Sequence, residues 1–335
     1  MANASHIRGL LLEEAILELL KKSGYTAITS EDQDIESGPS GLYVKGRGGR
    51  HQVDAIVKGD FAIPFTFPMR LIVEAKAYLP KYNNGRVGLP IVRSVVGVYK
   101  DINENFFSHL NSTYRRYSYH YAVFSLNGFT RDAEQYALAH EIFLFQYHYN
   151  SLFKGIRSLL NELTKNRVQN YFNIHTKYNE KDLRQLIRDL FKGKNADIAS
   201  EYIKEEGMDF LREFVSSVES IGGSYFDLIN GEYPVHITST KPIADISKNS
   251  DILKVKLYIE DNSLAVIIYH NQELFFELPE YHMEQLKKAA KKENPLSTRN
   301  KILNYISVFT INDGIRRILK LELDNDWLIQ VRKRQ

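Results

Sequence analysis

The sequence predicts an α/β protein whose N-terminal half is a mixed sheet flanked by helices. Three patterns support this prediction. Apolar residues recur at helical spacing in residues 5–23, and side chains alternate in residues 50–57 as they do along a strand. Residues 119–147 then read as strand, helix and strand. Because a crossover helix joins parallel strands, this unit predicts at least one parallel pair in the sheet.

The opening helix carries two adjacent glutamates, which helical geometry assigns to different sides. Leu12, Ile16 and Leu20 belong to the apolar stripe, and Glu13 lies on the edge of that stripe. Glu14 falls instead on a row that is otherwise polar. We therefore expect Glu13 to point inward and Glu14 to face solvent. For Glu13, an ordinary helix-surface carboxylate remains the alternative.

The stretch from Arg50 to Tyr78 begins and ends with a strand pattern and contains the main candidate site residues. Asp54 lies on the first strand, and the apolar run of residues 71–77 places Glu74 and Lys76 on one face of the second. If the insert of residues 59–69 lets the second strand fold back beside the first, Asp54 lies near both. A charged pair in an apolar strand is costly to bury without a partner. The three residues therefore form either a structural network between strands or a metal site.

An Asp followed by Glu-x-Lys on a later strand resembles the PD-(D/E)xK nucleases. The segment from Gly9 to Tyr25 is similar to the opening helix of the Mrr-type restriction endonucleases, and the segment from Ala122 to Ala137 is similar to that family's later strand and helix. The resemblance covers residues 7–147, with the elements in the family's order. It implies a restriction-endonuclease-like sheet and a metal-dependent DNA endonuclease.

The resemblance also assigns roles to individual residues. It implies that Mg²⁺ or Mn²⁺ is held by the carboxylates of Asp54 and Glu74 and by the carbonyl of Ala75, which are hard oxygen ligands. Lys76 would orient or help deprotonate the attacking water. Glu13 would bind a second metal directly or through water, or polarise Lys76. Gln52 would hold a water or a phosphate oxygen.

Basic residues near the Asp54 strand are candidates for phosphate contacts. The candidates are Lys45, Arg47, Arg50, His51 and, on the helix expected at residues 91–106, Arg93. The Mrr-type pattern often offers a Gln from that helix, whereas this sequence has Arg93 and Ser94. A solvated turn and a surface arginine are the alternatives.

The second half resembles no family that we identify. It predicts an α+β accessory domain over residues 151–335, helical in 151–220 and built mainly of antiparallel strands in 225–335, with a break at Gly222-Gly223. We expect it to separate from residues 1–150 near residues 155–173, where an exposed join would be nicked by limited proteolysis. DNA binding, oligomerisation and partner docking remain open as its role. Four lysines, at 287, 288, 291 and 292, and the tail Arg332-Lys333-Arg334 are its strongest basic clusters.

The composition excludes several kinds of site. The chain has 335 residues and no cysteine, so it has no disulfide and no thiolate metal centre, which fits the cytoplasm. Its polar start and the lack of any run near the roughly 20 apolar residues of a spanning helix predict neither a signal peptide nor a membrane segment. A net charge of +3 does not by itself indicate nucleic acid. No P-loop, dinucleotide-binding, nucleophile-elbow or zincin motif is present.

Together these observations favour a Mg²⁺-dependent DNA endonuclease. By resemblance, its setting is prokaryotic defence against foreign DNA, as a homodimer or higher oligomer or as the nuclease subunit of a complex with an ATPase. The alternative is a catalytically silent DNA-binding or scaffolding protein that retains the nuclease fold. We also expect Glu13→Ala to lower cleavage far more than Glu14→Ala.

Overall fold

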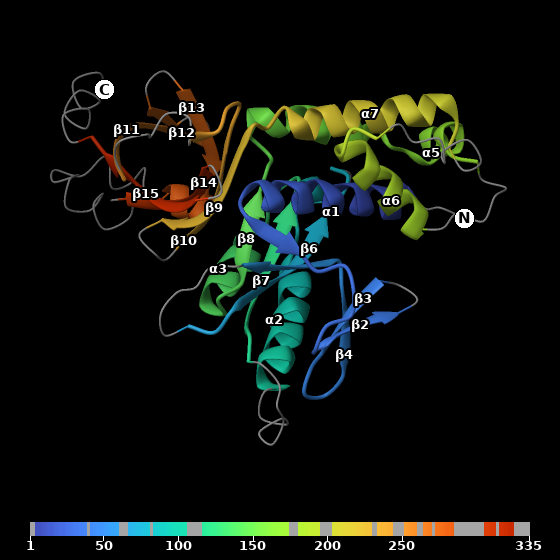
Figure 1. Ribbon diagram of the computed structural model, residues 1–335, viewed down its shortest axis with the longest axis horizontal. Helices are drawn as coiled ribbons and strands as arrows, with labels where there is room; N and C mark the ends of the chain where they lie inside the picture. The colour runs from blue at the N-terminus through green and yellow to red at the C-terminus, as the bar shows by residue number, and fades with distance from the viewer. Residues whose placement is uncertain are drawn as a thin grey trace.

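The computed structural model combines a helix-flanked sheet with a β-barrel (Figure 1). It describes residues 4–38, 41–59, 66–80, 83–105, 116–173, 180–194, 203–229, 233–243, 251–259, 264–269, 272–284, 305–312 and 315–324. The prediction of a mixed α/β protein is confirmed. In the described part of the chain, no helix is both long and apolar enough to cross a membrane.

The central sheet has five strands in the order β1-β5-β6-β7-β8. Their bounds are β1 Tyr25–Ala27, β5 Ala55–Gly59, β6 Met69–Lys76, β7 Ser118–Ser125 and β8 Phe143–Gln146. Strands β1, β5 and β6 pair antiparallel, whereas β6, β7 and β8 pair parallel, as the strand-helix-strand pattern predicted. Ala55 lies opposite Val73, so the strand that carries Glu74 and Lys76 does fold back beside the strand that follows Asp54.

Helices cover both faces of this sheet. Their bounds are α1 Ala4–Lys22 on one face, and α2 Leu89–Glu104 and α3 Arg131–Ala139 on the other. Alternation along β6 produces the two layers, because Leu71 and Val73 join the core beneath α1 while Ile72 joins the core of α2 and α3. A short 3₁₀ turn, η1 (Asn83–Gly85), precedes α2.

The predicted strand at residues 50–57 is two strands that belong to different sheets. The first, β4 (Arg50–Val53), pairs with β3 (Gly41–Lys45), which pairs with β2 (Ile35–Gly38) in a small antiparallel sheet. The second, β5, belongs to the central sheet. The chain bends at Asp54, between the two. This residue therefore lies at the corner where one sheet gives way to the other.

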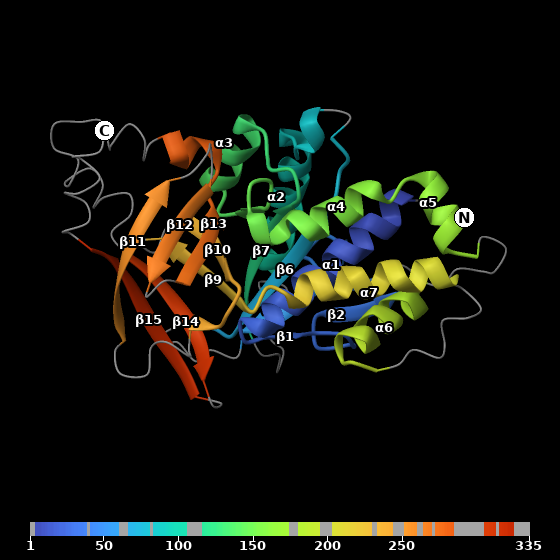
Figure 2. The same cartoon turned by 90° about the horizontal axis from the view of Figure 1, so that it is seen from above.

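Four helices after residue 150 extend the core of the central sheet. They are α4 Lys154–Glu162, α5 Lys165–Tyr171, α6 Glu180–Phe191 and α7 Glu205–Glu219, preceded by the 3₁₀ turn η3 Ser151–Phe153. One continuous hydrophobic cluster runs from Ile7 of α1 through these helices to Phe226, and α4, α6 and α7 lie around α1 (Figure 2). The predicted division at residue 150 thus falls inside this core, and so does the join expected at 155–173.

The architecture changes instead at Gly222-Gly223, where the sequence predicts a break. A Cβ at Gly222 would lie 2.2 Å from the carbonyl oxygen of Thr240. Because real Cβ atoms do not approach backbone oxygens so closely, only glycine lets the chain pass here from α7 into the first strand of the barrel.

The strands expected after residue 225 close into a seven-stranded barrel in the order β10-β13-β12-β11-β15-β14-β9. Their bounds are β9 Gly223–Ile229, β10 Tyr233–Ser239, β11 Ile252–Ile259, β12 Leu264–Tyr269, β13 Gln272–Glu277, β14 Tyr305–Asn312 and β15 Ile315–Leu323. The meander β11-β12-β13 is antiparallel, as predicted, but β11 and β15 pair parallel. The chain is helical at 280–284, and both basic clusters, Lys287–Lys292 and Arg332–Arg334, lie outside the described residues.

Buried polar groups join the barrel to the central sheet. The hydroxyl of Tyr147 and the Nδ1 atom of His236 are 2.8 Å apart. The Glu277 carboxylate accepts hydrogen bonds from the N–H groups of Tyr149, at 2.8 Å, and Asn150, at 2.5 Å. Burial raises the pKa of Glu277 to about 8, although these backbone donors oppose the shift.

This carboxyl gives the barrel junction a pH dependence. Because the folded protein holds the Glu277 proton more tightly than the unfolded chain, its contribution to stability is full below about pH 4.5 and is lost as the pH rises through 8. Glu277→Gln, which mimics the protonated form, should be more stable than the wild type at pH 9 by roughly 2–4 kcal/mol. Urea denaturation at pH 5 and pH 9 measures this, with the exposed Glu273→Gln on the same strand as control. An equal loss of stability with pH in both variants would contradict the expectation.

Candidate functional site

Asp54, Glu74 and Lys76 come together where β4 bends into β5 and where β6 ends. The backbone N–H of Ala75 donates to Asp54 Oδ2 at 2.9 Å. Lys76 Nζ donates to Glu74 Oε1 at 2.5 Å. The β5–β6 register explains this meeting, because Ala55 lies opposite Val73 and the residue before Ala55 therefore lies beside those after Val73. The structure thus brings together the three residues that the sequence pattern singled out.

Tyr121 of β7 is a fourth member of this cluster that the sequence did not indicate. Its hydroxyl donates to Glu74 Oε2 at 3.1 Å, so both oxygens of Glu74 have a donor. Burial and the neighbouring Glu74 raise the pKa of Tyr121 well above its usual value, which keeps it a donor. Its position depends on the parallel pairing of β6 with β7, for which a single tyrosine in an apolar strand gives no signal.

The charged groups of the cluster shift one another's pKa values. Burial and the Glu74 carboxylate raise the pKa of Asp54 to about 6, while Lys76 and the Ala75 N–H oppose the rise. Burial alone would lower the pKa of Lys76, but Glu74 and Asp54 raise it above its ordinary value. Lys76 is therefore a cation at neutral pH, bonded to Glu74, and the Glu74 and Asp54 carboxylates are close enough to repel each other.

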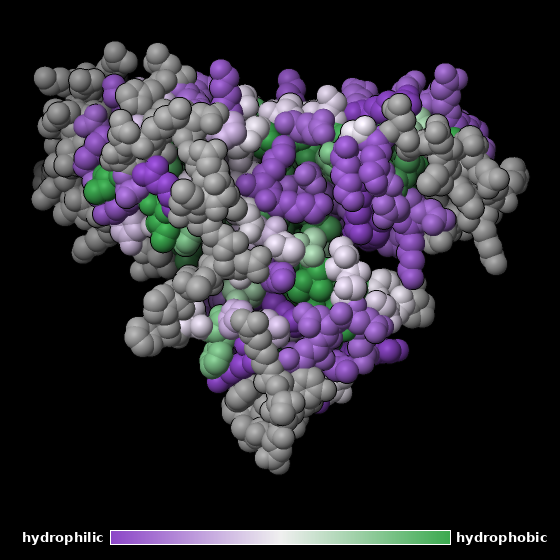
Figure 3. Space-filling model, in the orientation of Figure 1, coloured by the Kyte–Doolittle hydropathy of each residue, from purple (hydrophilic) through white to green (hydrophobic). Residues whose placement is uncertain are grey.

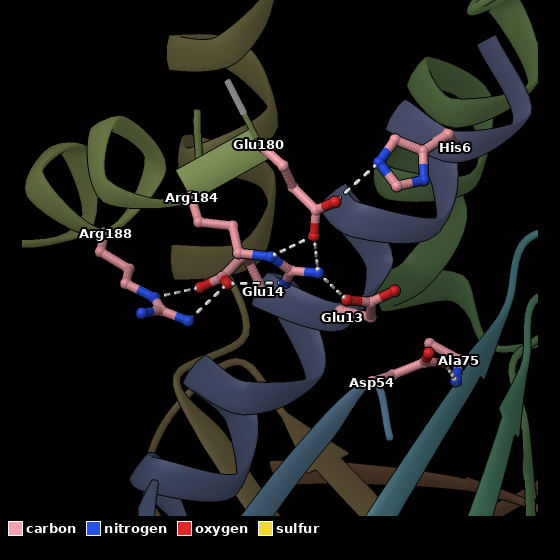
Figure 4. Close-up of polar contacts among 8 residues, drawn as sticks. All are labelled: His6, Glu13, Glu14, Asp54, Ala75, Glu180, Arg184 and Arg188. Carbon is pink, nitrogen blue, oxygen red and sulfur yellow. Dashed lines mark hydrogen bonds and ion pairs between the residues drawn. The ribbon is translucent and has the colours of Figure 1, made fainter. Parts of the chain in front are cut away.

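Glu13 approaches this cluster from α1, as its helical phase predicted. It is 7% exposed, and Figure 4 shows its carboxylate between Arg184 and Asp54. Arg184 Nη2 donates to Glu13 Oε2 at 2.5 Å. Burial and the Asp54 carboxylate raise the pKa of Glu13 to about 8, against the opposing effect of Arg184.

The outward orientation predicted for Glu14 is wrong. Glu14 is 2% exposed, accepts from Arg184 Nη1 at 3.1 Å and is held by Arg188 through two bonds of 2.8 Å. Both arginines belong to α6, which covers the side of α1 that its helical pattern assigns to solvent. That cover comes from a helix more than 160 residues further along the chain, and local periodicity does not reveal it.

The basic residues of the β3–β4 hairpin do not crowd around Asp54. Their ends pair with acids: Lys45 with Glu36 at 2.8 Å, Arg50 with Glu36 at 4.0 Å, Arg47 with Glu104 at 3.4 Å and His51 with Asp101 at 2.6 Å. The hairpin turn docks on the second half of α2 through Asp101, which also accepts from the Gly48 N–H at 2.8 Å. Since a strand rises about 3.3 Å per residue, Arg50 lies roughly 13 Å along the chain from Asp54. These basic residues therefore lie at the start of β4 and away from Asp54 itself, and their contacts with phosphate stay predictions.

Two other predicted site residues are exposed to solvent. Gln52 is exposed on β4, opposite Tyr43 of β3. Arg93 is exposed on α2, with its guanidinium 5.7 Å from the ring centre of Tyr136 on α3. Their proposed contacts with water or phosphate stay predictions.

The groups around Asp54 suit a hard divalent ion. The N–H and C=O of one strand residue point to the same side, so the Ala75 carbonyl faces the Asp54 side of β6 as its N–H does. Among the described residues, no three His, Cys, Asp or Glu side chains lie close enough to form a metal cage. Mg²⁺ commonly takes only one or two protein carboxylates and completes its octahedron with waters and substrate oxygens. Asp54, Glu74 and the Ala75 carbonyl match that donor set.

Comparisons with known proteins add little. No family model matches the chain, and no curated protein matches it. Among solved structures, a crystal structure of a protein of unknown function is similar over 63% of this chain and 97% of its own, with 15% sequence identity and a TM-score of 0.32. A likeness of that degree carries no argument about fold or function.

Proposed function

We propose that this protein is a metal-dependent DNA endonuclease with a restriction-endonuclease-like sheet. The observation that supports this most is the meeting of Asp54, Glu74 and Lys76 at the end of β6, with Asp54 bound to the Ala75 N–H. An Asp followed by Glu-x-Lys on a later strand that lies beside it is the arrangement that the PD-(D/E)xK resemblance implies. DNA as the substrate, a role in prokaryotic defence, oligomerisation and an ATPase partner rest on that resemblance alone.

The residues divide the work of phosphodiester hydrolysis between them. Asp54, Glu74 and the Ala75 carbonyl would hold Mg²⁺, which lowers the pKa of a bound water and polarises the phosphoryl group. Lys76 stays protonated beside Glu74, so it orients the attacking water by donating a hydrogen bond and offsets charge on the scissile phosphate. Tyr121 fixes the second oxygen of Glu74 and so limits its rotation.

Cleavage of plasmid DNA with and without metal tests the proposal. We expect supercoiled plasmid to be nicked or linearised in Mg²⁺ or Mn²⁺ and to stay intact in excess chelator, because the carboxylates repel each other and the phosphate without the ion. Asp54→Asn is the matched negative control, since the amide keeps the size and the hydrogen bond from Ala75. Cutting that continues undiminished in chelator, or in Asp54→Asn, would refute the metal mechanism.

A catalytically silent DNA-binding or scaffolding protein is the second candidate. It is favoured by the completeness of the internal pairing, because both Glu74 oxygens accept hydrogen bonds and one Glu13 oxygen is held by Arg184. Such a protein would bind DNA equally well with and without metal and would never cut it.

A further inference from the structure

Arg184 connects the candidate site to a helix that lies outside the nuclease-like region of residues 7–147. Its guanidinium contacts three carboxylates: Nε and Nη2 reach Glu180 at 2.9 and 2.8 Å, Nη1 reaches Glu14 at 3.1 Å, and Nη2 reaches Glu13 at 2.5 Å. These contacts involve all three guanidinium nitrogens. Hydrophilic side chains cover the surface over α6 and α1 (Figure 3), but the Arg184 side chain itself is only 19% exposed.

The partners of Arg184 are themselves held in place. His6 Nε2 lies 3.0 Å from Glu180 Oε2. Arg188 donates two hydrogen bonds to Glu14. As Figure 4 shows, the chain of contacts ends at Glu13, whose carboxylate faces Asp54. Arg184 is also near enough to Asp54 to lower its pKa, as the weakest of several influences. The guanidinium is thus a rigid, permanent positive charge at the edge of the acidic cluster.

We propose that Arg184 is a positioning residue of the site and that its guanidinium takes the place of a second metal ion beside Glu13. The protein would then bind one divalent ion, at Asp54, Glu74 and Ala75, and Glu13 would reach that ion only through water. This inference rests on the proposed function and narrows it to a one-metal site.

Electrostatics support a single ion. Asp54 lies within electrostatic reach of both Glu13 and Glu74, and a metal at Asp54 and Glu74 would leave Glu13 to be neutralised. Arg184 does this at 2.5 Å. A second divalent ion on Glu13 would have to sit beside a guanidinium that does not lose its proton, and like charges a few ångströms apart in a partly buried site repel strongly.

Counting bound Mn²⁺ tests this inference without relying on activity. We expect the wild-type chain to bind one Mn²⁺ at saturation, measured by calorimetry and by the loss of the free-Mn²⁺ electron paramagnetic resonance signal. Arg184→Gln should release Glu13 and raise the count to two. Arg188→Gln, one turn further along α6, removes a contact to Glu14 but none to Glu13, and should keep the count at one.

The possible outcomes separate the two proposals. Two Mn²⁺ per wild-type chain would overturn the role of Arg184 and leave the endonuclease proposal standing. No Mn²⁺ binding at millimolar concentration would refute the metal-dependent function itself. A count of one in folded Arg184→Gln would also overturn the inference, and if that variant does not fold, the wild-type count alone decides between one site and two.

Discussion

Lys76→Ala should lose at least about 100-fold of the cleavage rate while keeping its fold, because a positioned proton donor or acceptor typically contributes 10²–10⁴-fold to catalysis. The ion pair with Glu74 is partly open to water, with Lys76 and Glu74 side chains 19% and 18% exposed. Without Lys76, Glu74 keeps the Tyr121 hydroxyl and Asp54 keeps the Ala75 N–H. With a pKa of about 6, Asp54 also gains a proton readily when its cation is removed.

The competing expectation comes from the scaffold alternative. If Lys76 serves only to hold two buried carboxylates together, its removal should cost about 3–5 kcal/mol, a large part of the roughly 5–15 kcal/mol that stabilises a typical domain. Melting curves, DNA binding and plasmid cleavage on one preparation distinguish the two cases. Lys58→Ala, exposed on the neighbouring strand β5, is the control. A deep fall in melting temperature, with cleavage surviving in proportion to folded protein, would make Lys76 structural.

The acidic cluster was predictable because its geometry is local. Alternation along a strand places Glu74 and Lys76 on one face, and a strand that folds back after a short insert brings Asp54 beside them. Both rules act over about twenty residues. Such rules do not predict Tyr121 and Arg184. Their positions depend on the pairing of β6 with β7 and on the packing of α6 against α1.

Features that depend on distant parts of the chain could not be predicted for the same reason. Lys45, Arg47 and Arg50 are close to Asp54 in sequence, but an extended chain carries them away from it, to acids on β2 and α2. The helices after residue 150 show an apolar face in the sequence, yet the pattern does not say whether that face meets a new domain or the first one. Barrel closure likewise depends on β9 pairing with β14 and β11 with β15, strands that are separated by more than fifty residues.

Glu14→Ala should lower the free energy of unfolding by about 3 kcal/mol, the size typical of removing one partner from a buried ion pair. Glu14 is the more buried of the two adjacent glutamates, and its loss removes the carboxylate that holds Arg188 through two hydrogen bonds. Glu18→Ala, on the same helix but in a more exposed pair with Lys21, should cost no more than about 1 kcal/mol. Urea denaturation of the three proteins measures both values.

Substitutions of the two adjacent glutamates should affect different properties, cleavage for Glu13 and stability for Glu14. Glu13 faces Asp54, whereas Glu14 is bound by the arginines of α6. Glu13→Ala should therefore lower cleavage per folded molecule far more than Glu14→Ala, and Glu14→Ala should reduce activity mainly through the amount of folded protein. Equal loss of specific cleavage in the two variants would mean that α6 and its network, rather than the carboxylate of Glu13, set the geometry at Asp54.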